Sequence, residues 1–309
     1  MTVAGMANRD GVEGVRREVG HLRSTWYDLA TAAGSRDVGL CRIVLDPRGW
    51  STPAHIHAAE EEIFFVLAGD GLLWQDGATC RVGPGDTIAH RAGAETHTLR
   101  AGAGGLDVLA FGTRVPLELC YLPRAKHAWA GPVVLPTPGL YDLFPLDDAA
   151  GDFDFPESGE RFANVAALAD IDPIDPPGPP GRVRLDLGTA AGSHHTGLKQ
   201  VRSDPGKLIC VPHCHSAEEE LFVVIEGDGE LELGGEHHAV RSGSVVARPP
   251  GTGVAHAIRA GDGGITVLAY GTREPNDICY YPRSGKVYFC GLGVIGRLEP
   301  AGYWDGEEL

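Results

Sequence analysis

The sequence predicts an all-β protein made of two tandem small β-barrels, and three observations support this prediction. Glycine and proline are abundant, with 44 and 22 of the 309 residues, which is too many for a helical bundle and suits short strands joined by tight turns. Apolar runs of strand length recur at a spacing of about 8–12 residues, as in a sandwich or small barrel. The third observation is an internal repeat.

The repeat is visible when the chain is compared with itself. Residues 53–71 (PAHIHAAEEEIFFVLAGDG) match residues 211–229 (VPHCHSAEEELFVVIEGDG) at an offset of 158. Residues 120–124 (CYLPR) match residues 279–283 (CYYPR) at an offset of 159, because one residue is inserted between the two segments. Matched gaps over this length exclude chance similarity between glycine-rich segments. We therefore expect a duplicated domain of roughly 110–130 residues, an ordinary domain size.

The repeat, with the composition between its copies, predicts five segments. In chain order they are an N-terminal arm or helix at 1–25, the first barrel at 26–146, a linker at 147–182, the second barrel at 183–295 and a polar tail at 296–309. Within the linker, which is rich in aspartate and proline, we expect one short helix near residues 164–169.

Turn residues divide each copy into short strands. In the second copy the expected strands are residues 220–225, 230–233, 236–240, 244–248, 256–259 and 265–270. Gly227-Asp228-Gly229 and Gly234-Gly235 supply turns between the early strands, and a loop rich in glycine and proline at 249–253 precedes the strand that begins at His256. This alternation of strands and turns is typical of small all-β domains.

Composition excludes several classes of protein. With 43% apolar and 22% charged residues, the chain can bury a core, which excludes wholesale disorder. A formal charge of −16 argues against a nucleic-acid partner, which would require a basic face. No apolar run is long enough to span a membrane, and no signal peptide is visible. Seven cysteines, an odd number, suit reduced thiols, so we expect a cytoplasmic protein. We further expect a small-molecule substrate, and the sequence is compatible with a homo-oligomer.

Two clusters of histidine and glutamate carry the predicted chemistry. In each copy an H-x-H pair lies on a strand, a glutamate follows five residues later, and a third histidine opens a later strand. Side chains at i and i+2 leave a strand on the same face, and a turn after the pair would bring the glutamate to that face. The predicted ligands are His55, His57, Glu62 and His97 in the first copy, and His213, His215, Glu220 and His256 in the second. Three imidazoles and one carboxylate suit a divalent first-row metal.

These residues resemble the motifs of the cupin superfamily. The first cupin motif, H-x-H-x4-E-x6-G, occurs as His55, His57, Glu62 and Gly69, and again as His213, His215, Glu220 and Gly227. The second motif, G-x5-P-x-G-x2-H-x3-N, is recognisable as Gly243, Pro249, Gly251 and His256, and as Gly85, Arg91, Gly93 and His97. Both copies carry inserted residues and lack the terminal asparagine, and arginine replaces proline in the first. The resemblance implies a bicupin with two jelly-roll (double-stranded β-helix) barrels and two divalent metals per chain, such as Fe, Mn, Ni or Zn.

The resemblance leaves the reaction open, because one fold hosts many activities. We expect a metal-dependent enzyme, most plausibly a dioxygenase-type oxidoreductase that holds a small organic substrate beside dioxygen on the metal. One alternative is a non-redox metalloenzyme, such as a sugar isomerase, decarboxylase or aminohydrolase. The other alternative is a non-catalytic module that binds a small ligand.

Strand alternation predicts the wall beside each metal. The expected pocket residues are Phe64, Val66 and Leu99 in the first copy, and Phe222, Val224 and Ile258 in the second. Such a wall suits an aromatic or aliphatic substrate better than a sugar phosphate, although the same residues could be barrel core below a shallow site. One member of each pair Cys41-Arg42 and Lys199-Gln200 must also face inward, so we expect the two centres to differ in charge.

The remaining repeated polar residues have structural interpretations. Glu60, Glu61, Glu218 and Glu219 are expected to be solvated turn residues, with Glu61 and Glu219 as fallback ligands. Arg114 and Arg273 are expected to tie a barrel end or the interface between the barrels rather than to bind substrate.

Overall fold

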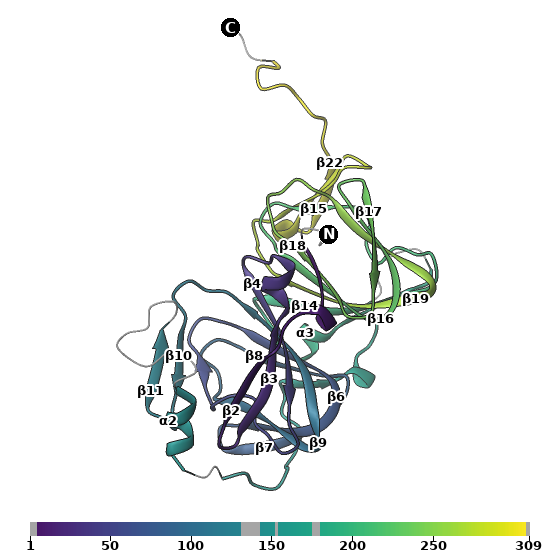
Figure 1. Cartoon of the computed structure of the whole chain (residues 1–309). Helices are drawn as coiled ribbons and strands as arrows, with labels where there is room; N and C mark the ends of the chain where they lie inside the picture. Colours follow the sequence, from purple (N-terminus) through teal and green to yellow (C-terminus); the bar gives the residue numbers. More distant parts are fainter. Residues whose placement is uncertain (1–4, 131–142, 152–153, 175–179, 307–309) are drawn as a thin grey trace.

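The computed structural model describes residues 5–130, 143–151, 154–174 and 180–306 of the chain (Figure 1). Its strands form two large antiparallel sheets and two small ones, so the expected mostly-β fold is confirmed. Within the described residues, the strand order of neither large sheet returns to its first strand. Closure of each sheet into a barrel is therefore not confirmed.

The first large sheet has eight strands in the order β12-β8-β6-β9-β4-β3-β2, with β7 paired to β6. Its strands are β2 (Val15–Val19), β3 (Leu22–Asp28), β4 (Val38–Leu45), β6 (Glu62–Gln75), β7 (Ala78–Val82), β8 (Asp86–His90), β9 (His97–Thr113) and β12 (Val165–Ala167). A small sheet beside it contains β5 (Ile56–His57), β10 (Leu119–Leu122) and β11 (His127–Ala130).

The second large sheet has seven strands in the order β1-β18-β16-β19-β14-β13, with β17 paired to β16. Its strands are β1 (Met6–Asn8), β13 (Arg182–Asp186), β14 (Thr196–Ser203), β16 (Glu220–Leu233), β17 (Glu236–Arg241), β18 (Ser244–Arg248) and β19 (His256–Thr272). Its small companion sheet contains β15 (Cys214–His215), β20 (Ile278–Tyr281), β21 (Lys286–Phe289) and β22 (Val294–Arg297).

The long strands β6 and β16 bend instead of ending at their glycines. The sequence predicts two short strands in this part of the second copy, but β16 is continuous over 14 residues. Its pairing with β19 shifts register on both sides of Gly227. A Cβ atom at Gly227 would lie 2.2 Å from the carbonyl oxygen of Gly264, and the same position in the first copy, Gly69, is equally crowded. Only glycine fits this close approach of two backbones.

The two copies exchange short strands. β1 pairs with β18 of the second sheet, although it precedes the first copy, and β12 pairs with β8 of the first sheet, although it precedes the second copy. The short helix expected near residues 164–169 is wrong, because β12 is a strand and only Leu168–Asp170 forms a 3-10 turn.

Helices are few and short among the described residues. They include α1 (Leu29–Ala33), α2 (Leu143–Ala149) and α3 (Leu187–Ala190). α1 and α3 occupy equivalent places in the repeat, and each begins after an aspartate whose side chain accepts a hydrogen bond from a threonine N–H. None of the described helices is long and apolar enough to cross a membrane.

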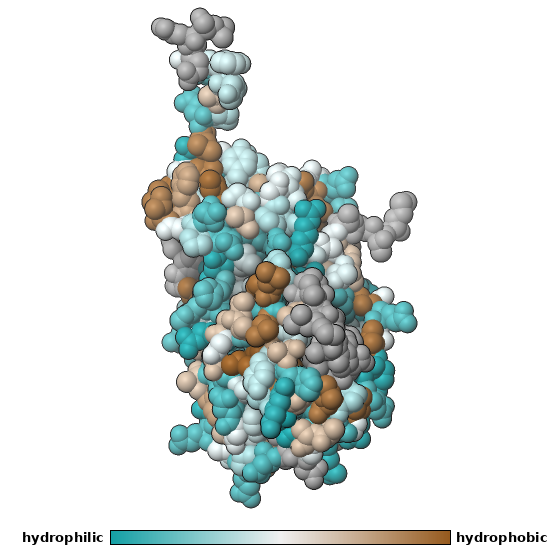
Figure 2. Space-filling model, turned by 90° about the vertical axis from the view of Figure 1, so that its left-hand side faces the viewer, coloured by the Kyte–Doolittle hydropathy of each residue, from teal (hydrophilic) through white to brown (hydrophobic). Residues whose placement is uncertain are grey.

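The core continues between the two copies. One apolar cluster contains residues of both sheets together with α1 and α3, including Phe111 and Tyr270, whose ring centroids are 5.0 Å apart. Two further clusters lie inside the individual copies. The face shown in Figure 2 mixes hydrophilic and apolar residues, and the apolar ones gather near the base of the C-terminal extension and in the middle of the face. Because they share a buried core, the copies form one packed unit.

Candidate metal centres

In the first copy, three imidazoles converge on one carboxylate oxygen, Oε2 of Glu62. The Nε2 atoms of His97, His57 and His55 lie 3.2, 3.8 and 3.9 Å from this oxygen. His57 ends β5, Glu62 begins β6 and His97 begins β9. The structure thus brings the four predicted ligands of the first copy together, and the turn predicted after the H-x-H pair is present at residues 58–60.

The second copy repeats this arrangement more tightly. The Nε2 atoms of His256, His213 and His215 lie 3.0, 3.3 and 3.4 Å from Oε2 of Glu220. His256 begins β19, as predicted for the third histidine. The four predicted residues of this copy also meet at one point.

Hydrogen bonds on the outer ring nitrogens fix the tautomers. Nδ1 of His55 lies 2.9 Å from the carbonyl oxygen of Pro53, and Nδ1 of His213 lies 2.7 Å from that of Val211. A carbonyl can only accept, so Nδ1 carries the proton and donates it. In the neutral form of each ring the lone pair is then on Nε2, which faces the glutamate, as in a metal-ligating histidine.

The residues present fit a divalent metal. Nε2 of His215, Nε2 of His256 and Oε2 of Glu220 are buried and have no hydrogen-bond partner. With neutral rings these atoms are all acceptors and do not attract one another at about 3 Å, and buried polar atoms without partners cost free energy. A cation placed among them satisfies all of these atoms at once, and nitrogen and carboxylate donors suit a first-row metal.

The pKa values of three residues of the first quartet match the protonation states that metal binding requires. Burial lowers the pKa of His55 to about 3 and that of His97 to about 4. Burial alone would raise the pKa of Glu62, but the neighbouring histidines lower it to about 2. His55 and His97 are therefore neutral beside an ionised carboxylate at neutral pH. Burial also lowers the pKa of His57, but its contacts with Glu118, Glu62 and Glu60 outweigh this effect and raise it.

The closer contacts of the second quartet favour protonation of the metal-free site. Burial lowers the pKa of His213, but contacts with Cys210 and Glu220 outweigh this effect and raise it to about 11. Protons therefore compete more strongly with a metal here than at the first quartet.

Two buried carboxylates that the sequence analysis did not single out support the turn after each H-x-H pair. Glu118 accepts hydrogen bonds from the N–H groups of residues 58–60, and Asp277 accepts them from those of residues 216–218. Oδ2 of Asp277 also lies 2.7 Å from Nδ1 of His215, whereas Oε1 of Glu118 lies 3.4 Å from Nδ1 of His57. Both acids stand two residues before the repeated Cys-Tyr, which is the signal that could have identified them.

Glu61 and Glu219 are not solvated turn residues, and this expectation is wrong. Their exposed fractions are 1% and 0%. Glu61 accepts hydrogen bonds from residues 193–196 of the second copy, and Glu219 accepts them from residues 36–38 of the first. Successive side chains of a strand point to opposite faces. Because Glu61 and Glu219 point into the other copy, the next residues, Glu62 and Glu220, point toward the quartets of their own copies.

The neighbouring acids and the repeated arginines also have partners. Glu60 and Glu218 are part-buried rather than solvated, and each accepts a hydrogen bond from a backbone N–H. Arg114 donates to Ser35 and Thr31, and Arg273 donates to Ser193 and Thr189. These bonds tie the loops at the interface of the copies, as the sequence predicts for both arginines.

The predicted pocket residues are all buried, and two of them lie beside a histidine of a quartet. The ring of Phe64 is 6.1 Å from that of His97, and the ring of Phe222 is 5.4 Å from that of His256, between centroids. All six belong to the apolar clusters inside the two copies, and the other four are Val66, Leu99, Val224 and Ile258. This burial agrees with the alternative that such residues are core below the site.

The inward-facing members of the two predicted pairs are Cys41 and Lys199. Cys41 packs against the core of the first copy, whereas Arg42 forms an ion pair with Asp107 at 2.7 Å. Lys199 occupies the place of Cys41 in the second copy, so Gln200 faces the other side of the sheet. The inner face of the second sheet therefore carries a lysine where that of the first carries a thiol.

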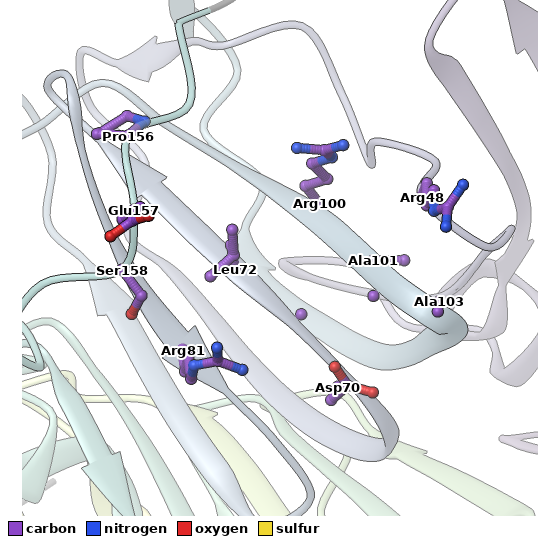
Figure 3. Close-up of a pocket in the computed structure, with 12 residues that line it drawn as sticks. Arg48, Asp70, Leu72, Arg81, Arg100, Ala101, Ala103, Pro156, Glu157 and Ser158 are labelled. Carbon is purple, nitrogen blue, oxygen red and sulfur yellow. The ribbon is translucent and has the colours of Figure 1, made fainter.

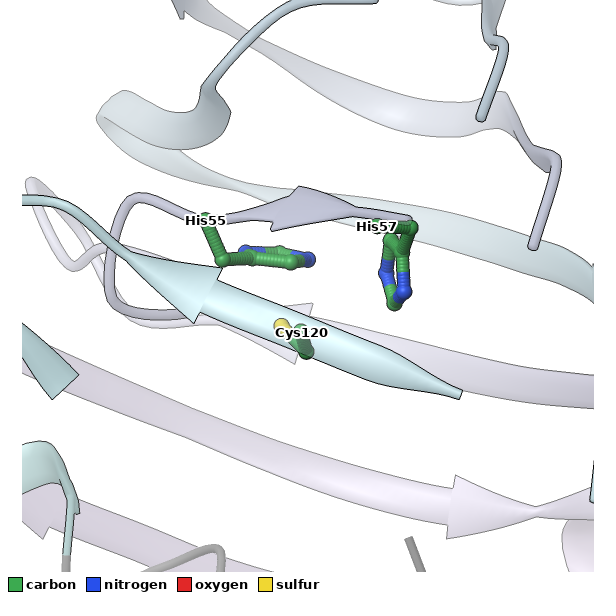
Figure 4. A group of neighbouring side chains, drawn as sticks. All are labelled: His55, His57 and Cys120. Atoms are coloured by element: carbon green, nitrogen blue, oxygen red, sulfur yellow. The ribbon is translucent and has the colours of Figure 1, made fainter. Parts of the chain in front are cut away.

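A cysteine lies beside each H-x-H pair. Cys120 on β10 pairs with His57 in register, and Figure 4 shows it on the strand next to His55 and His57. One donor atom from each of these three residues lies within 4.8 Å of the others, and His213, His215 and Cys279 form the same group. Burial raises the pKa of Cys120, so its thiol stays protonated at neutral pH in the metal-free protein.

A separate pocket lies outside both quartets (Figure 3). It encloses about 630 Å³, and its lining includes Arg48, Arg81 and Arg100 of the first copy together with Glu157 from the linker. It contains none of the predicted site residues.

Comparison with known families identifies the class of protein. The cupin domain family matches residues 41–109 and again residues 200–269. The chain belongs to the cupin superfamily and carries two cupin domains. No curated protein sequence matches the chain significantly.

Solved structures of the same architecture include bicupin oxalate decarboxylases. The enzyme from Lactobacillus farciminis, in a formate complex, is 14% identical, with a TM-score of 0.60 over 88% of this chain and 87% of that one. The Bacillus subtilis enzyme is 16% identical, with a TM-score of 0.58 over 87% of this chain and 76% of that one. Another structure of the B. subtilis enzyme, 15% identical with a TM-score of 0.55 over 87% and 78%, concerns its Mn(II) centres. At these identities the similarity shows a common fold.

Proposed function

We propose that this bicupin is a metal-dependent enzyme that acts on a small organic acid without net oxidation, in a reaction of the decarboxylase type. The observation that carries the proposal is the convergence of three imidazole Nε2 atoms on one buried carboxylate oxygen in each copy. The structural relatives are decarboxylases, which favours this non-redox alternative over the dioxygenase expected from the sequence.

The residues of the quartets would hold one divalent ion each, and such an ion supplies a Lewis acid that polarises a carboxylate or carbonyl oxygen. Glu62 and Glu220 contribute the negative charge of each site. Asp277 orients His215 by accepting its Nδ1–H. Phe64 and Phe222 exclude water beside the third histidine of each quartet.

The test is turnover by the reconstituted chain. The protein is loaded anaerobically with Mn(II), Fe(II), Ni(II) or Zn(II) and incubated with short mono- and dicarboxylic acids, while carbon dioxide release and oxygen uptake are both recorded. The proposal expects carbon dioxide without net oxygen uptake. Oxygen consumed in proportion to substrate would instead establish the dioxygenase, and binding without turnover would indicate a ligand-binding module.

Matched variants separate the metal centres from the rest of the chain. His55→Ala with His57→Ala, and His213→Ala with His215→Ala, should each reduce turnover if the corresponding centre is active. His237→Ala is the control, because this side chain is 53% exposed and pairs with Glu230 outside both quartets.

A further inference from the structure

Three inward-facing positions of the second copy carry cations where the first copy has uncharged side chains. At the repeat offset of 158, the corresponding pairs are Trp26 and Arg184, Cys41 and Lys199, and His90 and Arg248. Of these, only the pair Cys41 and Lys199 is expected from the sequence alone to differ beside the metal. The structure shows where the other two lie.

Arg248 lies next to the glutamate of the second quartet. It ends β18 and stands directly opposite Glu220 on β16, and directly opposed residues leave a sheet on the same face. The arginine is 8% exposed, its Nε has no hydrogen-bond partner, and Nη2 reaches only the carbonyl oxygen of Val254 at 3.4 Å. A buried guanidinium that is so weakly bonded is costly unless another group pairs with it.

The first copy shows how close this position is to the ligands. There, His90 stacks on His97 with a centroid distance of 3.6 Å and an interplanar angle of 2°. In the first copy the residue at this position therefore contacts the third histidine of its quartet.

Arg184 and Lys199 lie on the same inner face of the second sheet. Val201 pairs with Arg184, belongs to the core of the second copy and lies two residues from Lys199. Lys199 pairs with Ala269, which packs against the same core. Nε of Arg184 is buried without a partner. In the first copy the equivalent side chains, Trp26 and Cys41, pack against the core.

The carboxylates nearby are already occupied. Asp186 stands opposite Lys199 on β13, but it accepts the N–H of Thr189 and lies 3.7 Å from Arg273. Glu220 faces its three histidines. Among the residues that the structure describes, none of the three cations is within ion-pair distance of an acid.

We propose that the second centre binds the carboxylate of an anionic substrate through Arg248 and Lys199, with Arg184 adding positive charge, and that the first centre does not. This assignment rests on the proposed function. A planar guanidinium offers two parallel N–H donors that match a carboxylate, and a lysine adds a point charge. The first centre presents an imidazole, a thiol and an indole at the same three places, so it lacks this anion site.

The test compares the two centres in the full chain by binding rather than by activity. The double variants His55→Ala/His57→Ala and His213→Ala/His215→Ala each leave one intact quartet, which is loaded with Mn(II) and verified by metal analysis. Acetate is then titrated, with acetamide as the neutral probe and inorganic phosphate as the second anion, and binding is followed by calorimetry and water-proton relaxation. We expect acetate to bind the second centre at least about tenfold more tightly than the first, and acetamide to show no preference.

Substitutions in the chain with only the second centre assign the effect to the cations. Arg248→Gln should raise the dissociation constant for acetate about tenfold, and Lys199→Gln by a smaller factor, with metal content and melting temperature as checks on folding. Cys41→Lys with His90→Arg should improve acetate binding at the first centre.

The proposal would be overturned by equal affinity of the two centres for acetate, or by unchanged affinity in both second-centre variants. Tighter binding of phosphate than of acetate would overturn the assignment to a carboxylate. Absence of turnover alongside the expected binding pattern would contradict the proposed function alone.

Discussion

The two copies hold nearly the same ligand geometry in different surroundings. Each copy has three histidines on one glutamate, an acid under the H-x-H turn and a cysteine on the adjacent strand. The copies differ where side chains face the space beside the quartet, with His90 and Cys41 in the first copy and Arg248 and Lys199 in the second. The residues that would hold a metal and those that would select a substrate therefore occupy separate positions, and the second set can change without the first.

The largest expected effect is on metal content. Because both quartets are complete, wild-type protein reconstituted anaerobically should approach two divalent ions per chain by elemental analysis. His55→Ala with His57→Ala should remove one ion, and His213→Ala with His215→Ala should remove the other. A wild-type chain that saturates at one ion would show that only one copy is a metal site.

The contact between the copies should account for a large share of stability. Glu61→Ala leaves the donors of residues 193–196 buried without an acceptor, so the free energy of unfolding should fall by about 3 kcal/mol or more. Glu219→Ala should act similarly through residues 36–38. Urea denaturation measures both, with Glu236→Ala as the control because its side chain is 81% exposed. Losses below about 1 kcal/mol would contradict the role of these acids in holding the copies together.

Metal removal should lower stability by a moderate amount in each copy. An ion that binds only the folded state contributes about 2.7 kcal/mol at a hundredfold excess over its dissociation constant. Chelation should therefore lower the melting temperature while the β-sheet circular dichroism signal persists, since each copy has its own apolar core. Loss of β-structure on chelation would make the ions structural and weaken the proposed function.

The smallest effect should distinguish the two supporting acids. Asp277→Asn weakens the acceptor for Nδ1 of His215 at 2.7 Å, whereas Glu118→Gln alters a longer contact of 3.4 Å with His57. Loss of such an outer partner typically costs about 10–100-fold in metal affinity. We expect the Asp277 variant to lose more affinity for Mn(II) than the Glu118 variant in competition titrations. The reverse order would show that these hydrogen bonds do not tune the ligands.

The sequence predicted the ligands because their information is local. The spacing of His55, His57 and Glu62 places three donors within a few residues, and the strands beginning at His97 and His256 follow clear glycine-containing loops. Residues 244–248 were likewise predicted as a strand with the observed bounds. Short-range periodicity and turn chemistry are sufficient for these features.

The missed features depend on contacts between distant residues. β1 has three residues and pairs with a strand more than two hundred positions away, so no local sequence pattern predicts this strand. The glutamates at 60–62 resemble a solvated run, yet Glu61 is buried because its partners lie in the other copy. Arg248 ends a strand beside a loop, and only its register against Glu220 reveals the face on which it lies.

The exchange of β1 and β12 constrains how such a chain could have arisen. A protein with a single copy would present an unpaired strand edge at β18 or β8 and a leading strand with no place in its own sheet. In a dimer of two identical subunits, each leading strand could pair with the open sheet edge of the other subunit, if the subunits exchange these strands around a twofold axis. Gene duplication and fusion would then convert that mutual exchange into the present single chain. A gene split between the copies should consequently yield two fragments that are stable only when expressed together.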